Sequence, residues 1–356
     1  MLISIANKKI LKVFLYMLIS FIILLLALGT IIYFSENGRI MLPVKQKEAF
    51  QNVNLDDFPP MLYVEGNKIL QPSGDVIVLR GLMPPDPVKL HSKNKFNKRF
   101  FQKIKDSGAN VLRIPVHPEN YYYNKDYLWR YLDPAVAWAG ELGMYIIIDW
   151  HYIGNIENST GEKMPDIDIE AKEFTIQFWK QVANYFKEVP NVIFEIFNEP
   201  ANISSELWTK NAAEIIEIIR EQEAEQIIIV GGIDYSKNLS WVKEIPIDKD
   251  NIVYASHIYP IHNNWAYYFG DAAEKYPVLI TEWGYMDENR STTNQHYLIG
   301  DQQTYGKPFI NYLNEKGIGW VACWFDNSWE PQIFQKDFKS YTNYGAFVME
   351  ALKSNE

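Results

Sequence analysis

The sequence predicts an α/β fold, a (β/α)8 TIM barrel preceded by an N-terminal transmembrane helix. Short runs rich in β-branched residues alternate with amphipathic helical stretches, which is the pattern of a parallel sheet with crossover helices. Eight such runs occur over about 290 residues, and no G-x-G-x-x-G motif follows the first, which favours a barrel over a doubly wound sheet. A long uncharged run near the N-terminus predicts the membrane segment.

The N-terminal segment Val13–Phe34 contains no charged residue. As a helix it would extend about 33 Å, enough to cross a hydrocarbon core of roughly 30 Å. Residues 1–12 form a basic stub that stays in the cytoplasm by the positive-inside rule, because Lys8, Lys9 and Lys12 lie there. We therefore expect a single-pass cell-membrane protein whose main domain is extracytoplasmic. A cleaved signal peptide and a secreted protein are the alternative, since Ala27–Gly29 could serve as a cleavage site.

The segment after this run is polar, lacks a hydrophobic period and ends in Asp57-Phe58-Pro59-Pro60. We expect residues 35–60 to be a tether and residues 61–356 to be the barrel domain. Within that domain, Met61–Leu70 has a Glu65-Gly66-Asn67 turn between two short apolar runs. This pattern predicts a β-hairpin that caps the bottom of the barrel.

The remaining elements follow in order along the chain. The predicted strands are Val76–Arg80, Asn110–Val116, Met144–Trp150, Asn191–Phe197, Gln226–Gly231, Asn251–Tyr259, Pro277–Trp283 and Ile318–Phe325. The predicted helices are Phe96–Ser107, Ile169–Lys187, Glu206–Glu223, Gln302–Lys316 and a final one near Asn343–Leu352.

Composition and charge exclude several classes of function. The 356 residues include 34 Lys and Arg and 44 Asp and Glu, so the formal net charge is −10. This balance argues against a nucleic-acid partner, because binding a polyanion needs clustered cations. The single cysteine, Cys323, excludes an intramolecular disulfide framework and a cysteine-based zinc site. The six histidines form no H-E-x-x-H motif.

The carboxyl ends of barrel strands are where the βα loops build an active site. Polar residues can occur there simply because a strand emerges into water. Two glutamates are harder to explain in that way, since Glu199 ends the fourth strand and Glu282 ends the seventh. These strands lie across the barrel mouth, so both carboxylates could reach one bond, which is the arrangement that glycoside hydrolysis needs.

Other polar and aromatic residues lie at the strand ends beside Glu199 and Glu282, namely Arg113, His151, Asn198, His257, Tyr259 and Trp324. This set of eight resembles the pattern of glycoside hydrolase family 5, the cellulase family within the clan of retaining barrel glycosidases. The resemblance covers roughly residues 62–352. The resemblance implies that Glu199 is the acid/base, Glu282 the nucleophile and Asn198 the partner of the sugar 2-hydroxyl. One departure is that Arg80–Pro85 lacks the asparagine that often follows the arginine-glycine pair.

The same resemblance assigns supporting roles to the other members of the set. It implies that Arg113 and Tyr259 support the nucleophile, and that His151 and His257 line the sugar subsite at the cleavage point, subsite −1. Trp324 would be the floor of that subsite.

These roles agree with the requirements of a retaining mechanism. One carboxylate must be ionised and the other protonated, with the two about 5 to 5.5 Å apart. Arg113 and Tyr259 would favour the charged form of Glu282, and its charge would increase the proton affinity of Glu199. Nothing in this cycle requires a metal or an organic cofactor, so we expect none.

Aromatic residues in the loops indicate a saccharide substrate. Pyranose rings pack their C–H faces on aromatic rings, and Trp265 and Trp329 follow shortly after motif strands, so they are possible subsite aromatics, although both could be surface packing residues. We expect an endo-acting hydrolase of a β-linked glucan, a cellulase-like endoglucanase. The alternatives are a β-mannanase or transglycosylase of the same family and an inactive, membrane-tethered carbohydrate-binding barrel.

Overall fold

A computed structural model describes residues 16–17, 33–34, 40–41, 53–161, 165–287 and 295–353. The chain divides into two compact units, residues 1–46 and residues 47–356. In the first unit, β1 (Tyr33–Phe34) pairs antiparallel with β2 (Ile40–Met41). Most of the predicted transmembrane run Val13–Phe34 lies outside the described residues. Among the residues that are described, no helix has both the length and the hydropathy needed to span a bilayer.

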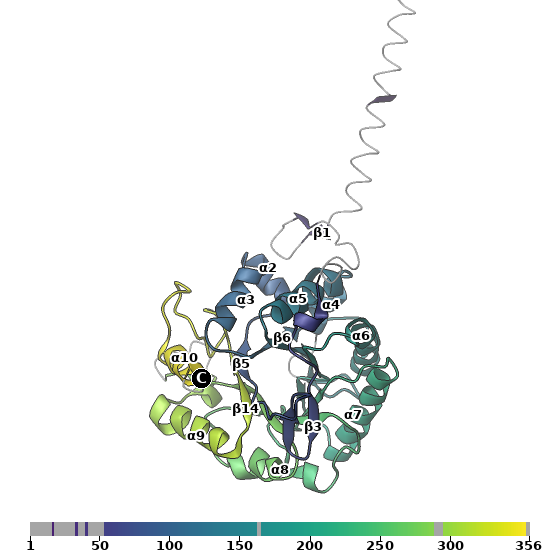
Figure 1. Cartoon of the computed structure of the whole chain (residues 1–356). Coiled ribbons are helices and arrows are strands. Elements are labelled where there is room, and N and C mark those ends of the chain that lie inside the picture. Colours follow the sequence, from purple (N-terminus) through teal and green to yellow (C-terminus); the bar gives the residue numbers. More distant parts are fainter. Residues whose placement is uncertain are drawn as a thin grey trace, which may run out of the picture. The chain divides into compact units, whose positions relative to one another are not determined.

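The second unit is a closed barrel of eight parallel strands surrounded by helices (Figure 1). The strands are β5 (Arg80–Met83), β6 (Val111–Val116), β7 (Tyr145–Trp150), β9 (Val192–Glu195), β11 (Ile228–Gly231), β12 (Ile252–Ile258), β13 (Val278–Trp283) and β14 (Gly319–Cys323). They follow one another around the barrel in chain order, and β14 closes on β5. The predicted (β/α)8 barrel is therefore confirmed.

The first barrel strand lies further along the chain than predicted. Val76 bridges Leu70, and the amide of Ile77 donates to the carbonyl of Ile69, so the β-branched residues extend the N-terminal hairpin instead. The barrel strand begins at Arg80 and includes Gly81, where a Cβ would lie 1.8 Å from a backbone oxygen of β6. The close approach of two strands, rather than β propensity, selects the residue there.

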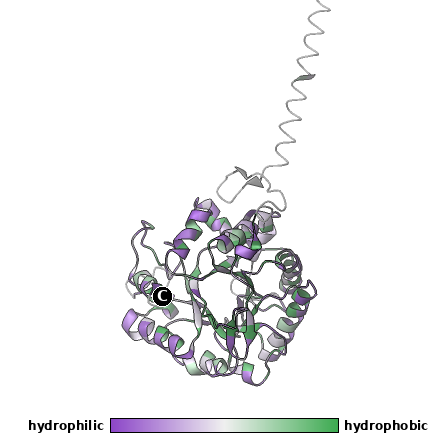
Figure 2. Cartoon of the chain, in the orientation of Figure 1, coloured by the Kyte–Doolittle hydropathy of each residue, from purple (hydrophilic) through white to green (hydrophobic). Residues whose placement is uncertain are grey.

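The helices form the outer layer of the barrel, with their polar faces outward and the apolar strands at the centre (Figure 2). They are α2 (Pro87–Ser92), α3 (Lys98–Lys105), α4 (Pro118–Tyr123), α5 (Asp133–Glu141), α6 (Ala171–Phe186), α7 (Ser205–Arg220), α8 (Asp271–Ala273), α9 (Lys307–Lys316) and α10 (Asn343–Lys353). Helix α5 was not among the predicted helices. Its Pro134 resembles a helix breaker but occupies the first turn, where proline is tolerated. A π-helical turn, Gln302–Gly306, accounts for the first part of the predicted helix before α9.

The predicted hairpin is present as β3 (Tyr63–Glu65) and β4 (Lys68–Leu70), joined by a two-residue turn. Leu62 and Ile69 belong to the same hydrophobic cluster as the inward side chains of the barrel strands. The amide of Val64 also donates to the side chain of Asn251, which directly precedes β12. The hairpin therefore closes the end of the barrel where the strands begin, and Figure 1 shows β3 across that opening.

The packed domain begins earlier than the expected boundary at Met61. Residues Leu55–Asp57 form a 3-10 turn, and Phe58 is buried in the core between barrel and helices. The ring of Phe58 lies so close to Gly140 of α5 that a Cβ there would be 2.2 Å from it. Residues 53–60, which the sequence analysis assigned to the tether, are thus part of the barrel unit, because a buried aromatic ring anchors them.

Strand β13 carries one more residue than its neighbours at its carboxyl end. On one side Ser256 pairs with Ile280 and His257 pairs with Glu282, and on the other side the register with β14 shifts in the same segment. Side chains normally alternate between the two faces of a strand. Because of this bulge, Thr281 and Glu282 are consecutive residues that both contact side chains in the barrel interior.

Candidate active site

The predicted site residues meet at the carboxyl end of the barrel. Arg113 comes from β6, Glu282 from β13 and His257 from β12, while Glu199 begins β10 (Glu199–Pro200), a short strand just after β9. The other predicted members, which follow β7, β9, β12 and β14, are His151, Asn198, Tyr259 and Trp324. A continuous chain of contacts connects all eight residues.

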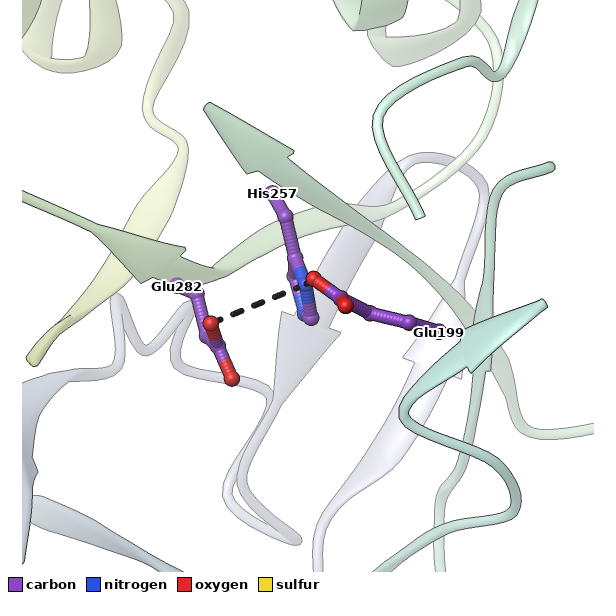
Figure 3. Close-up of side chains that lie close together, drawn as sticks. All are labelled: Glu199, His257 and Glu282. Atoms are coloured by element: carbon purple, nitrogen blue, oxygen red, sulfur yellow. Dashed lines mark hydrogen bonds and ion pairs between the residues drawn. The ribbon is translucent and has the colours of Figure 1, made fainter. Parts of the chain in front are cut away.

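The two glutamates face each other across His257 (Figure 3). Oε1 of Glu199 lies 2.9 Å from Nδ1 of His257, and Oε2 of Glu282 lies 3.8 Å from the same nitrogen. One carboxylate oxygen of each glutamate and one ring nitrogen of His257 all lie within 4.8 Å of one another. This spacing is closer to the roughly 5 to 5.5 Å between the carboxyl groups of retaining glycosidases than to the roughly 6.5 to 9.5 Å in inverting ones.

Glu199 is held by backbone pairing outside the barrel ladder. Strand β10 pairs in parallel with β8 (Ile153–Gly154), and the amide of Glu199 donates to the carbonyl of Tyr152 at 3.0 Å. The Glu199 side chain retains 16% of its exposure, whereas that of Glu282 retains 6%. The Glu199 carboxylate is thus partly exposed to solvent, and the Glu282 carboxylate is almost fully buried.

Hydrogen-bond donors hold both oxygens of Glu282. Arg113 donates from Nη1 to Oε1 at 2.7 Å, and the hydroxyl of Tyr259 donates to Oε2 at 2.8 Å. Burial alone would raise the pKa of Glu282, but the charges of His257, Arg113 and His151 together with the Tyr259 hydrogen bond lower it to about 2. Glu282 is therefore a carboxylate across the physiological pH range.

Arg113 is fully buried and is the centre of the charge network. Besides Glu282 it contacts Glu195 through Nε at 2.6 Å and Nη2 at 3.1 Å, and Asp149 at 3.1 Å. Its Nη2 also donates to Oδ1 of Asn198 at 2.8 Å. One guanidinium therefore orders three carboxylates and one amide, and its Nη1 also donates to the sulfur of Met83 at 2.9 Å.

Two members of this network were given no site role from the sequence. Asp149 lies 2.6 Å from Nδ1 of His151 and so orients that ring. Burial raises the pKa of Asp149 to about 7, although Arg113 acts in the opposite direction. Glu195 accepts from Arg113 and from the hydroxyl of Thr281, the latter at 2.9 Å. The available signal was strand alternation, which allowed Glu195 to point inward but did not identify its partner.

The Asn198 amide has an unused donor. Its Oδ1 accepts from Arg113, while Nδ2 is buried and has no hydrogen-bond partner among the described residues. An unpaired buried donor costs free energy unless a ligand satisfies it. Nδ2 of Asn198, beside Glu199 in the chain, is therefore available to a hydroxyl group of a bound molecule.

Aromatic rings and a histidine form one wall of the site. Trp324 packs edge-to-face on Trp329 with ring centroids 4.8 Å apart, and Trp329 packs edge-to-face on His117 at 5.7 Å. The His117 ring in turn lies 4.5 Å from that of His151. Of the two tryptophans expected near a cleft, Trp329 thus lies beside the site.

Trp265 does not belong to this wall. Its ring contacts Tyr305, Phe309 and Tyr312 in and before α9, which covers the outside of the barrel. The Trp265 ring thus packs against a helix, and its subsite role stays a prediction. Tyr297 was not among the predicted site residues. Its ring lies 5.2 Å from that of Tyr259, and its pKa is raised by burial and by Glu199 and Glu282.

Glu199, His257 and Glu282 together have donor atoms of the kind that bind metal ions. However, both oxygens of Glu282 already accept hydrogen bonds, one of them from the Arg113 guanidinium at 2.7 Å. A metal cation bound there would lie next to a fixed positive charge. We therefore assign no metal ligands in this cluster.

Comparison with known proteins identifies the family. A family model described as cellulase (glycosyl hydrolase family 5) matches residues 81–329, well over half of the chain. The chain belongs to glycosyl hydrolase family 5.

Relatives of this family 5 chain include two endoglucanases. Endoglucanase A of Butyrivibrio fibrisolvens is 30% identical over 244 residues, which cover 64% of this chain and 52% of the relative. Endoglucanase N of Pectobacterium atrosepticum is 28% identical over 274 residues, which cover 73% of this chain and 56% of the relative. The chain thus spans about half the length of these relatives.

Solved structures of similar proteins agree with the family 5 fold. The β-glucanase SdGluc5_26A of Saccharophagus degradans has a TM-score of 0.79 and 28% identity, with 85% of this chain and 96% of that chain covered. The same β-glucanase has also been solved in complex with cellotetraose. The catalytic domain of Thermobifida fusca endoglucanase Cel5A has a TM-score of 0.70 at 21% identity, and this match concerns the fold alone.

Proposed function

We propose that this chain is a retaining, endo-acting β-glycoside hydrolase that cleaves a β-linked glucan, with Glu199 as acid/base and Glu282 as nucleophile. The observation that carries the proposal is that two carboxylates within 4.8 Å of each other have different environments. Glu282 is enclosed and ionised, whereas Glu199 is partly exposed and hydrogen-bonded to His257. This asymmetry suits a nucleophile and a proton donor.

In the first step, a carboxylate oxygen of Glu282 attacks the anomeric carbon while Glu199 gives its proton to the leaving oxygen. The C–O bond to the leaving sugar breaks as the bond to Glu282 forms. Arg113 and Tyr259 hold Glu282 in place for the attack. The free Nδ2 of Asn198 would donate to the sugar 2-hydroxyl, and such hydrogen bonds strengthen in the transition state.

In the second step, water attacks the same carbon from the opposite side. Glu199, now a carboxylate, takes a proton from this water, and the bond between the sugar and Glu282 breaks. His151, His257 and Trp324 would enclose the sugar ring in subsite −1. A sugar hydroxyl can replace the water in this step, so transglycosylation remains an alternative outcome.

The β-glucan assignment rests on the chain's relatives. Two are named endoglucanases, and a similar structure is a β-glucanase with bound cellotetraose. Release of reducing sugar from carboxymethyl-cellulose, glucomannan and mixed-linkage glucan should be greatest on a glucan, with an early fall in viscosity as the sign of endo action. Preference for glucomannan would indicate a mannanase, and binding without any product would indicate an inactive carbohydrate-binding barrel.

The roles of the two glutamates can be separated with azide. Glu199→Gln leaves the nucleophile, so a dinitrophenyl cellobioside should still form the glycosyl-enzyme, and azide should restore turnover with a β-glycosyl azide as product. Glu282→Gln should lose many thousandfold in rate and give no β-glycosyl azide, because no covalent intermediate can form. A β-azide product from Glu282→Gln and none from Glu199→Gln would reverse the assignment.

We also propose that Val13–Phe34 anchors the protein in the cell membrane, with the barrel on the extracytoplasmic side. The support is the uncharged run and the three lysines that precede it. The full chain should sediment with membranes after carbonate extraction and be digested by protease added outside the cell. Recovery of a soluble form that begins near Thr30 would show a cleaved signal peptide instead.

A further inference from the structure

Thr281 occupies an unusual position next to the nucleophile. The bulge in β13 allows its side chain and that of Glu282 both to point into the barrel interior, where Thr281 is completely buried. Its hydroxyl lies 2.9 Å from Oε1 of Glu195 and 3.1 Å from Nε2 of His257. The hydroxyl therefore lies between a carboxylate that Arg113 orders and the histidine that contacts Glu199.

The direction of the hydrogen bonds from His257 through Thr281 to Glu195 follows from the protons that each group can donate. A hydroxyl group has one proton to donate and lone pairs to accept with. Both oxygens of Glu195 accept from Arg113 in a two-pronged contact, which suits an ionised carboxylate that can only accept. Thr281 then donates to Glu195, and its oxygen accepts from a proton on Nε2 of His257. Nδ1 is consequently the ring nitrogen that faces the proton of Glu199.

We propose that Thr281, together with Glu195, is a positioning residue that keeps one proton on the Glu199–His257 pair by accepting a hydrogen bond from Nε2 of His257. The proposal rests on the assignment of Glu199 as the acid/base. With this polarity, the shared proton lies between Oε1 of Glu199 and Nδ1 of His257, 2.9 Å apart, on either atom. In both placements Nε2 keeps its own proton and the hydrogen bond to Thr281.

This arrangement has a consequence for the proton balance of the reaction. When Glu199 gives its proton to the leaving oxygen, the pair loses the shared proton, and a carboxylate then faces an imidazole nitrogen. The proton taken from the attacking water restores the pair in the second step. The hydrogen bonds through Thr281 to Glu195 stabilise the protonated pair, because Thr281 accepts from Nε2 and Glu195 places a negative charge nearby.

His257 is surrounded by charged and titratable groups from several elements. They are Glu195 from β9, Glu199 from β10, Glu282 from β13, Arg113 from β6, Asp149 from β7, and the neighbouring histidines 151 and 262. Burial raises the pKa of Glu195, while Arg113 opposes this effect. If Glu195 were protonated, both hydrogen bonds would run the other way: Thr281 would donate to Nε2, and Nδ1 would carry the proton of His257. The direction in which the basic limb of the pH–rate profile moves in a Thr281 variant distinguishes the two arrangements.

The test is the pH dependence of kcat/KM in Thr281→Val, with the full chain in detergent and an unactivated substrate such as cellotetraose. Valine replaces the hydroxyl by a methyl group and removes the acceptor for Nε2. The basic limb of the profile, where the pair loses its proton, should move to lower pH by less than about one unit, because the hydrogen bond from Nε2 is lost in both protonation states and only its greater strength in the protonated pair counts. Thr281→Ser, which keeps the hydroxyl, should restore the wild-type limb.

Two controls separate positioning from a general structural effect. Thr175→Val removes a buried hydroxyl in α6, which accepts from Trp150 and donates to the carbonyl of Ala171, and should leave the limb unchanged. A dinitrophenyl cellobioside needs no proton from Glu199 in the first step. The pH profile of kcat/KM for this substrate should therefore have the same basic limb in Thr281→Val as in the wild type.

The outcomes distinguish this inference from the proposed function. A limb that moves to higher pH, or a uniform fall in kcat/KM at every pH, would overturn the role given to Thr281. In that case Glu199→Gln should still lose kcat/KM on cellotetraose while keeping kcat/KM on the dinitrophenyl substrate, since kcat/KM reports the first step there. If Glu199→Gln instead cleaves both substrates like the wild type, the acid/base assignment itself fails.

Discussion

Replacing Arg113 by lysine tests whether the shape of the guanidinium, rather than its charge, organises the site. Arg113 makes two contacts to Glu195 and one each to Glu282, Asn198 and Asp149, all at 3.1 Å or less. Lysine keeps the positive charge but has three donors on a single nitrogen. It can therefore replace at most three of these five contacts.

The magnitude follows from the contacts that are lost. A hydrogen bond to a charged group contributes about 1.5 to 3 kcal/mol, so two lost contacts cost about 3 to 6 kcal/mol. A barrel of about 300 residues unfolds with an entropy of roughly 0.6 kcal/mol/K, so this loss lowers the Tm by about 5 to 10 °C. The pKa of Glu282, which is about 2 with Arg113 in place, should rise toward its ordinary value.

Two measurements check this prediction in Arg113→Lys: thermal unfolding by circular dichroism and kcat/KM on an aryl cellobioside at acid pH. We expect a lower Tm, and an acid limb that moves to higher pH as Glu282 loses a donor. Arg80→Lys is the control, because Arg80 donates from its side chain to Asn314 near the surface and touches none of the carboxylates in the site. If the variant keeps both the Tm and the acid limb of the wild type, the positive charge alone is sufficient.

Three further predictions follow from the structure. The ionised Glu282 stabilises the fold by about 3 kcal/mol above about pH 4.5, and this contribution is lost as the pH falls toward 2. In urea titrations over that range, the free energy of unfolding of the wild type should therefore fall relative to that of Glu282→Gln. Trp329→Ala should raise the KM for cellotetraose about tenfold, whereas Trp265→Ala should mainly lower the free energy of unfolding. Equal KM values for the two variants would contradict a place for Trp329 beside the substrate. Phe58→Ala should destabilise the barrel by about 3 to 5 kcal/mol in the same titrations, and a cost near zero would exclude residues 53–60 from the core.

The barrel fold and the residues at the ends of its strands could be predicted from the sequence alone. Each strand end is a local feature, in which an apolar run stops at a polar residue, and the order of these residues along the chain carried the resemblance to the family. The eight motif residues accordingly meet at one end of the barrel. Trp329 lies beside them because its loop follows β14 directly.

Other features depend on packing between distant segments and could not be read from local patterns. Whether Glu195 reaches Arg113 depends on two strands that are not neighbours in the sheet. Trp265 and Trp329 both follow barrel strands, but only the structure shows that the Trp265 ring packs against α9. The segment that begins at Val76 has the composition of a barrel strand, yet Val76 pairs with Leu70 of the hairpin.

The bulge in β13 limits how this barrel can be recombined with others. Because the additional residue lies between Ile280 and Trp283, a regular strand of the same length would point either Thr281 or Glu282 toward the helices. A chimera that exchanges β13 alone would therefore lose one of the two inward side chains even if every motif residue were retained. Strands β12 and β13 should instead be exchanged as one module, since the shifted pairing of His257 with Glu282 is shared between them.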